Sequence, residues 1–349
     1  MDVLGWSPPC FCRGTLIGTG RGEVAVEDLA IGDAVVSLSG AARPIKWIGR
    51  RAYDGKFVTG NSAALPIRIE AGALAEGVPK RDLCVSPEHA LYIDGVLVPA
   101  GLLVNGATIT QVERVDRLEY FHIELDSHDV ILAEGAPAET FIACDNRGVF
   151  QNSVEFARLY PGDMRPGWDF CAPRLDEASV ELPAIRAAFL ERAEARGDRL
   201  TDDPDLHLIV DGEVVRPQEI AEDCYSFSIP PGSGAIWLAS RSAVPAEGDP
   251  ASQDRRRLGV LVTRIVLRED DLRIEIGHGH ASLREGFHEN ETGQRWTDGM
   301  ARLPDELLRP FIGEATVELH LIKPSLRYRL AAPATEPVPA PRNPSRARR

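Results

Sequence analysis

Between residues 14 and 150, short stretches of alternating apolar and polar residues follow one another, separated by glycine-containing turns. The run Glu23-Val24-Ala25-Val26-Glu27 alternates in this way, which is typical of a half-buried strand. Asp94-Gly95 lies between two apolar runs, Leu91-Tyr92-Ile93 and Val96-Leu97-Val98, a pattern that predicts a two-residue β-hairpin. No segment of useful length in this region has the helical period. Residues 10–150 are therefore predicted to form an all-β domain, after a short N-terminal leader of residues 1–9.

The pattern changes after residue 150. Residues 151–200 look like a connector that contains one helix over 183–196, because Pro183 stands at its first turn and Gly197 just past its end. Alternating stretches return over residues 201–330, with an Asp211-Gly212 turn, and predict a second, β-sandwich-like domain. The Pro- and Arg-containing tail, residues 331–349, is expected to be disordered. The predicted fold class is mainly β: two β domains and one helix.

Composition and charge narrow the classes of function. The chain has 349 residues, 44% of them hydrophobic, which suits two domains with ordinary cores. Its net charge of −14 argues against nucleic acid as a partner. Six cysteines are too few for a disulfide scaffold in a chain of this length, and no cofactor is expected.

Neither a signal peptide nor a membrane span is apparent. The first nine residues have no basic region, and no stretch approaches the roughly 20 apolar residues that a membrane helix needs. A cytoplasmic location is the default expectation, with secretion by a route that needs no N-terminal signal left open.

The candidate chemistry begins at Cys10. A thiol at this position can attack the carbonyl of Pro9 and convert the amide into a thioester, provided that the amide is activated and the oxyanion is held. Ser86 and His89 stand three residues apart in Ser86-Pro87-Glu88-His89, so a hydroxyl and an imidazole can activate that amide together. This pattern indicates a self-cleaving protein whose substrate is its own N-terminal segment.

These residues belong to a longer series of motifs that resembles the bacterial Hint (Hedgehog/intein) domains over about residues 9–150. The shared motifs include Cys10-Phe11, Gly14-Thr15-Leu16-Ile17, Gly32-Asp33, Trp47-Ile48-Gly49, Ser86-Pro87-Glu88-His89-Ala90-Leu91 and Tyr120-Phe121-His122-Ile123-Glu124-Leu125. The resemblance implies an all-β horseshoe fold and an autoprocessing activity.

The resemblance also implies roles for individual residues. Cys10 takes the place of the nucleophile of the acyl shift, and Ser86 and His89 take the places of the threonine and histidine of the intein TxxH block. His128 takes the place of a late intein histidine, and His122 stands where many inteins carry an aspartate. If His122 and His128 lie on one strand, they face the same side.

The sequence departs from inteins at two points. Inteins usually end in His-Asn, whose asparagine cyclises, whereas the matching region here reads Ala133-Glu134-Gly135-Ala136-Pro137-Ala138-Glu139-Thr140. Pro9 also hinders attack on its carbonyl. We therefore expect an N-to-S acyl shift at Cys10 and cleavage of Pro9–Cys10, without full splicing. The alternative is a non-enzymatic Hint scaffold, in which Cys10 is a buried thiol and His89 a core histidine.

In that alternative, the C-terminal domain binds a glycan or a protein. Trp296, Arg295 and Glu291 are the candidate binding residues, because sugar rings stack on tryptophan and sugar hydroxyls pair with charged groups. The run from Gly286 to Thr297 resembles β-sandwich modules that accompany some bacterial glycosyltransferases. A structural network around a buried tryptophan would use the same residues. The pairs Cys10 with Cys12, His122 with His128, and His278 with His280 are the alternatives for a metal site, and no metal is expected.

Overall fold

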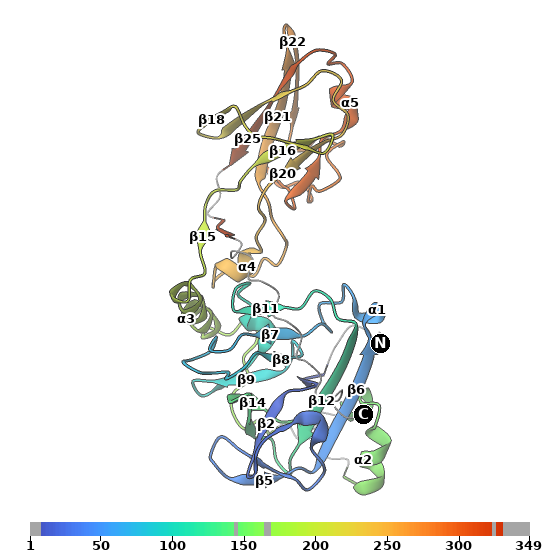
Figure 1. Ribbon diagram of the computed structural model, residues 1–349, viewed down its shortest axis with the longest axis vertical. Helices are drawn as coiled ribbons and strands as arrows, with labels where there is room; N and C mark the ends of the chain where they lie inside the picture. The colour runs from blue at the N-terminus through green and yellow to red at the C-terminus, as the bar shows by residue number, and fades with distance from the viewer. Residues whose placement is uncertain (1–7, 143–145, 164–168, 323–325, 331–349) are drawn as a thin grey trace, which may run out of the picture. The chain divides into compact units, whose positions relative to one another are not determined.

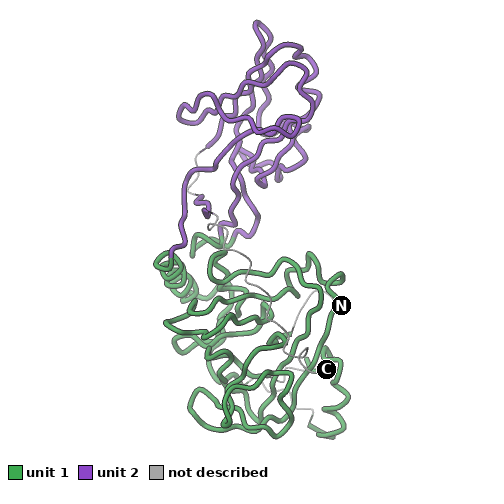
Figure 2. The backbone as a smooth tube through the Cα atoms, in the orientation of Figure 1, with its two compact units in different colours: residues 1–196, 246–253 green, residues 197–245, 254–349 purple. Residues whose placement is uncertain are grey.

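The computed structural model describes residues 8–142, 146–163, 169–322 and 326–330. The chain divides into two compact units, the first made of residues 1–196 and 246–253 and the second of residues 197–245 and 254–349 (Figure 2). Most of the predicted leader, Cys144 and the predicted tail at 331–349 lie outside the described residues. Both units are built mainly of strands, which confirms the predicted fold class.

One sheet of the first unit contains the strand that follows Cys10, and the other strands of this sheet are labelled in Figure 1. Its six strands run in the order β11 (Ile109–Gln111), β7 (Ile67–Ile69), β8 (Leu83–Val85), β1 (Phe11–Cys12), β12 (Arg117–Glu124) and β6 (Trp47–Asp54). The short β1 lies between β8 and β12, and Phe11 faces Val85 on one side and Phe121 on the other. The candidate nucleophile is thereby fixed between two strands that are distant in sequence.

The other sheet of the first unit carries the hairpin that the sequence predicts. Its strands run in the order β10 (Val96–Pro99), β9 (Ala90–Ile93), β14 (Ala136–Glu139), β13 (Val130–Ala133), β2 (Leu16–Thr19), β4 (Ala34–Val36) and β5 (Ala42–Pro44), with β3 (Gly22–Ala25) paired to β2. Asp94 and Gly95 join β9 to β10 with φ of 47° and 94°, the left-handed conformations that this tight turn requires. The predicted hairpin is confirmed.

The helices of the first unit are short except for one. Helix α3 (Leu182–Ala195) confirms the predicted helix, and its Leu182 and Phe189 join the main hydrophobic core of this unit. Helix α2 (Ser153–Leu159) lies in the stretch that the sequence suggests is only a connector, and its Phe156 packs on Trp47. The remaining helical segments are α1 (Gly55–Val58) and the 3₁₀ turns Val26–Asp28, Ala100–Leu103 and Arg147–Val149.

The second unit packs two antiparallel sheets around one core, as a β-sandwich does. One sheet has the order β17 (Glu213–Val215), β16 (His207–Val210), β20 (Ile236–Ala239) and β24 (Met300–Arg302). The other has the order β18 (Glu219–Ala221), β19 (Cys224–Ile229), β25 (Ala315–Ile322), β21 (Leu261–Glu269) and β22 (Leu272–Gly277), with β23 (Arg295–Trp296) paired to β21. The pair β15 (Leu200–Thr201) and β26 (Tyr328–Arg329) and the short helices α4 (Pro245–Gly248) and α5 (Asp305–Leu308) complete the described elements.

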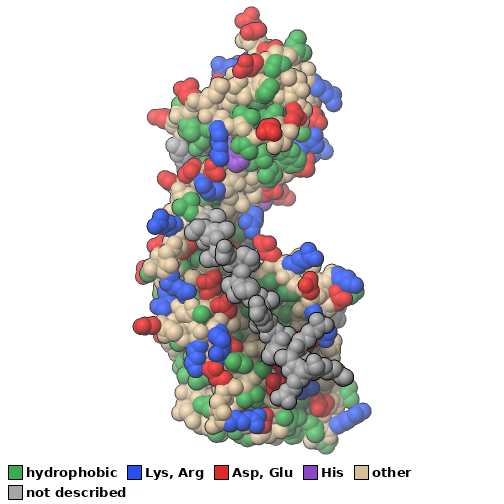
Figure 3. Space-filling view, in the orientation of Figure 1, with side chains coloured by type: hydrophobic (Ala, Val, Ile, Leu, Met, Phe, Trp, Pro, Cys, Tyr) green, Lys and Arg blue, Asp and Glu red, His purple; other side chains and the backbone are tan. Residues whose placement is uncertain are grey.

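The Asp211-Gly212 turn between β16 and β17 is present as predicted, with positive φ at both residues. On the face seen in Figure 3, basic and acidic side chains are interspersed over both units. Within the described parts of the chain, no helix combines the length and apolarity needed to cross a membrane.

Candidate functional site

Cys10 lies immediately before β1 and is fully buried. Its side chain belongs to a small apolar cluster on one face of the first sheet, formed mainly by aromatic rings. The aromatic members of this cluster are Trp47, Tyr120, Phe141, Phe150 and Phe156. Burial raises the pKa of the Cys10 thiol well above its ordinary value of 9.0, and Arg51 only partly opposes this shift. The thiol is therefore protonated at neutral pH.

Ser86 holds the backbone on both sides of the Pro9–Cys10 bond. Its hydroxyl accepts the backbone N–H of Cys10 at 2.8 Å and donates to the carbonyl of Pro8 at 2.8 Å. Its own N–H donates to the carbonyl of Cys10 at 2.9 Å. Because Ser86 directly follows β8, these contacts continue the pairing of β1 with β8 by one residue and fix the amide that Cys10 would attack.

His89 closes a tight turn that begins at Ser86, since its N–H donates to the Ser86 carbonyl at 3.0 Å. Its ring is fully buried and contacts the ring of Phe11 in a tilted arrangement, with 4.2 Å between the centroids. Neither ring nitrogen has a hydrogen-bond partner among the described residues. Burial, together with the charges of Arg174 and His128, lowers the pKa of His89 to about 3, so the ring is neutral at neutral pH.

His122 lies beside His89. It is part of β12, its ring centroid is 5.2 Å from that of His89, and burial lowers its pKa well below the ordinary value, with His89 as a further cause. His128 is not on the same strand, because β12 ends at Glu124 and exposed residues 126 and 127 follow. The expectation that the two histidines share one strand face is therefore wrong, and His128 reaches the site from the loop before β13.

His128 lies beside a buried ion pair, Glu139 with Arg174, that the sequence did not indicate. Glu139, at the end of β14, accepts two hydrogen bonds from one Nη of Arg174, at 2.7 and 2.8 Å. Its carboxylate also accepts the N–H of Ala90, next to His89, and lies 3.5 Å from Nε2 of His128. Although burial opposes ionisation, His128 and Arg174 keep the pKa of Glu139 below its ordinary value.

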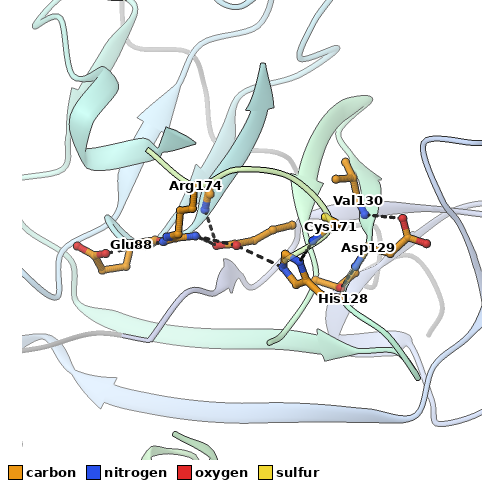
Figure 4. A network of polar contacts seen from close by, with 9 residues as sticks. Glu88, His128, Asp129, Val130, Cys171 and Arg174 are labelled. Atoms are coloured by element: carbon orange, nitrogen blue, oxygen red, sulfur yellow. Dashed lines mark hydrogen bonds and ion pairs between the residues drawn. The ribbon is translucent and has the colours of Figure 1, made fainter. Parts of the chain in front are cut away.

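Arg174 belongs to the chain that follows the predicted domain, and it also donates to the carbonyl of Glu88. Figure 4 shows Arg174 beside Glu88 at one end of this network and His128 beside Cys171 at the other. The only sequence signal for the pair was a glutamate in an otherwise apolar run, at Glu139. Nothing local to Arg174 distinguishes it from a surface arginine.

The protonation of His128 is coupled to this network. Burial disfavours its charged form, but the side chains of Cys171 and Glu139 raise its pKa to about 9. The backbone N–H of Cys171 donates to Nδ1 of His128 at 3.1 Å, which requires a lone pair on that nitrogen. A charged His128 must therefore give up the Cys171 contact and keep its ion pair with Glu139.

The candidate binding residues of the second unit have structural partners. Trp296 is only 9% exposed and packs with Leu258 and Leu261. Arg295 donates to the carbonyl of His288, and Glu291 pairs with Arg256 at 3.0 Å. These contacts favour the structural network over a ring open for sugar stacking. Glycan or protein binding remains a prediction.

The three residue pairs weighed as metal ligands are not part of the group of three possible ligands found in the described part of the chain. Cys10 with Cys12, His122 with His128, and His278 with His280 do not bring three ligand atoms together there. His278 instead pairs with the side-chain oxygen of Asn290 at 2.6 Å.

Comparison with known proteins identifies the domain family of the first part of the chain. The profile of the Hint domain family matches residues 9–145, and no curated protein matches the chain. Among solved structures, the gp41-1 intein is 17% identical, with 38% of this chain and 98% of the intein covered and a TM-score of 0.29. An intein-like domain from Clostridium thermocellum is 16% identical, with 38% and 99% covered and a TM-score of 0.28.

A third solved structure, a DnaB intein from Synechocystis sp. PCC 6803, is 12% identical, with 39% of this chain and 100% of the intein covered and a TM-score of 0.28. The family match covers the whole arrangement of Cys10, Ser86, His89, His122 and His128. Residues 9–145 are thus a Hint/intein-like domain, a member of a family of self-processing domains.

Proposed function

We propose that this Hint domain cleaves its own chain between Pro9 and Cys10 by an N-to-S acyl shift followed by hydrolysis, and that it does not splice. The observation that carries the proposal is the Ser86 hydroxyl, which bridges the Cys10 N–H and the Pro8 carbonyl. A serine in this position orients the scissile amide and can stabilise charge that develops on it.

The acyl shift proceeds in two bond changes. The Cys10 sulfur attacks the carbonyl carbon of Pro9 and forms a C–S bond, and the C–N bond to Cys10 then breaks. The thiol proton ends on the freed α-amino group of Cys10. Water then hydrolyses the thioester, which leaves a carboxylate on Pro9 and restores the thiol of Cys10.

His89 is suited to carry the proton. A neutral, buried imidazole accepts the thiol proton as sulfur attacks and returns it to the leaving nitrogen, so one group acts first as base and then as acid. His122 lies beside His89, with 5.2 Å between the ring centroids, and burial likewise lowers its pKa, so it is also neutral. The two rings therefore favour transient over lasting protonation.

Splicing would also require cleavage at the other end of the domain. There, Thr140 exchanges hydrogen bonds with Asp129 through its backbone N–H and its side-chain oxygen, and no asparagine stands beside it. Without an amide side chain to cyclise, the thioester has water as its acceptor.

Intact-mass measurement tests the proposal. The purified full chain is incubated with dithiothreitol, and we expect the mass to fall by residues 1–9. Cys10→Ala should stay whole, while Cys12→Ala, which removes the neighbouring thiol, should still be cut. Retention of the leader by the unaltered chain would favour the scaffold alternative.

A further inference from the structure

A group of possible metal ligands lies on the outer face of the larger sheet of the second unit, where β19 and β25 pair (β25 is labelled in Figure 1). Cys224 faces His320 across the two strands, and Glu318 lies two residues before His320 on the same face of β25. Tyr225 and Leu319, which follow Cys224 and Glu318 in their strands and pair with each other, point into the core. Strand alternation therefore places a thiol, an imidazole and a carboxylate side by side.

We propose that Cys224, Glu318 and His320 bind a zinc ion. Their three ligand atoms all lie within 4.8 Å of one another. Nε2 of His320 is 3.8 Å from Sγ of Cys224 and 3.7 Å from Oε2 of Glu318. Tetrahedral zinc, with its usual bond lengths, separates such ligand atoms by about 3.4 to 3.6 Å. The two distances from His320 thus need to shorten by only a few tenths of an ångström.

The donor set fits zinc better than a harder ion. Thiolate and imidazole together select zinc or a similar borderline metal, whereas calcium and magnesium prefer oxygen ligands only. His320 and Glu318 side chains are 20% and 19% exposed, so the site is partly screened but open to an entering ion. Three protein ligands leave a fourth position for water.

Two arginines of β21 compete with the ion. Arg268 lies 3.2 Å from Oε2 of Glu318, and Arg264 lies 3.5 Å from Nδ1 of His320. A ring that binds metal through Nε2 carries its proton on Nδ1, so Arg264 must turn away. Glu275 can receive it, since it already lies 3.5 Å from Arg264.

The test is a zinc titration of the reduced, chelator-treated full chain against a chromophoric zinc indicator, repeated with cobalt. We expect one zinc ion per chain and a cobalt spectrum with a thiolate charge-transfer band. Cys224→Ser should abolish that band, and His320→Gln should weaken zinc binding at least about 100-fold, since even changes around a ligand cost 10- to 100-fold. Zinc should also raise the melting temperature of the chain but not of Cys224→Ser.

Control variants separate this site from other zinc ligands. Cys171→Ser removes an exposed thiol, and His278→Gln removes a histidine of the same unit; both should bind zinc as the unaltered chain does. Arg268→Gln should tighten binding several-fold, because it removes a competing cation. Loss of binding in either control, binding that survives Cys224→Ser, or no binding by the unaltered chain would overturn the proposal.

Discussion

At the scale of single residues, the reactivity of this domain depends on a thiol that burial keeps protonated. Cys10 packs among aromatic rings, and the charge of Arg51 partly opposes the rise in its pKa. Its neighbour in the mechanism, His89, is neutral for the same reason, burial. The thiol of Cys10 and the imidazole of His89 therefore begin uncharged, and the charges that the reaction creates on them must be stabilised by hydrogen bonds that are already in place.

The rate of leader release should rise with pH. Because the pKa of Cys10 lies above 9.0, each pH unit below that value reduces the thiolate fraction about tenfold. At alkaline pH the thiolate attacks directly, so cleavage should accelerate with the thiolate fraction. Near neutrality the protonated thiol passes its proton to the neutral His89 during the attack, and cleavage by this route should be slow and only weakly dependent on pH. Mass spectra taken over time between pH 6 and pH 10 measure this, with Cys10→Ala as the background. A rate that falls over this range would contradict it.

Replacing Ser86 should affect both chemistry and stability. Ser86→Ala leaves the buried N–H of Cys10 and the carbonyl of Pro8 without this partner, at a cost of about 1–3 kcal/mol. We expect at least a tenfold slower cleavage. Ser86→Thr restores the hydroxyl and should recover most of the rate, which a purely structural loss of packing would not explain. The cleavage rates of the three chains, measured at equal folded fraction, give the comparison.

At the scale of elements, the segment 171–175 completes the first unit from outside the family match. Arg174 forms a parallel bridge with Leu97 of β10, and the backbone of Leu175 donates to the Leu97 carbonyl at 2.8 Å. This short added strand places the guanidinium of Arg174 against Glu139. The carboxylate that contacts His128 and Ala90 therefore depends in part on a separate segment for its ionised state.

Arg174→Met should be strongly destabilising at neutral pH. The substitution leaves the carboxylate of Glu139, which is 1% exposed, without its ion-pair partner Arg174. Loss of one partner of a buried pair costs about 3–5 kcal/mol of stability. In the unaltered chain the pKa of Glu139 lies below 4.5, so the pair stabilises the fold above about that pH and loses its contribution as the pH falls through the folded-state value. The difference between variant and parent should therefore shrink in acid.

Urea denaturation at pH 7 and at pH 4 measures this difference. The double variant Glu139→Gln with Arg174→Met is the matched control, because it removes both charges and keeps an acceptor for the Ala90 N–H. It should recover a large part of the stability lost in the single variant. Equal destabilisation of the single and the double variant would show that the charge of Glu139 is not the cause.

Features that depend on residues close together in the sequence could be predicted, whereas contacts between distant residues could not. The hairpin at Asp94-Gly95 and helix α3 were predictable because their signals are local: two residues with positive φ, and a proline and a glycine at the helix ends. Placing His122 and His128 on one strand overlooks the turn signal of Asp126-Ser127, which follows the end of β12 at Glu124.

The pairing of Glu139 with Arg174 had no such local signal. The two residues are 35 positions apart, and only the folded sheet brings them together. The grouping of Cys10, Ser86 and His89 could be inferred from spacing and family resemblance. The hydroxyl bridge that Ser86 forms could not, because it depends on the register between β1 and β8.

At the scale of the whole molecule, the first unit extends well beyond the family match at residue 145. Leu175, Leu182 and Phe189 all belong to its core. A chain that ends at residue 160 should therefore melt at a lower temperature than one that ends at residue 199, since it exposes this core and leaves Glu139 without Arg174. Circular dichroism melts of both shortened chains test this, and equal melting temperatures would contradict it.

Residues 246–253 belong to the first unit, whereas the chain on both sides of them belongs to the second. Arg186 of α3 holds this segment through the carbonyls of Pro250 and Ser252, at 3.0 and 3.2 Å. The polypeptide therefore passes between the units three times, at residues 197, 246 and 254. A protease that cuts once at residue 197 does not free either unit, because the looped-back segment still tethers them. Separating the units, by force or by proteolysis, also requires segment 246–253 to be released from Arg186.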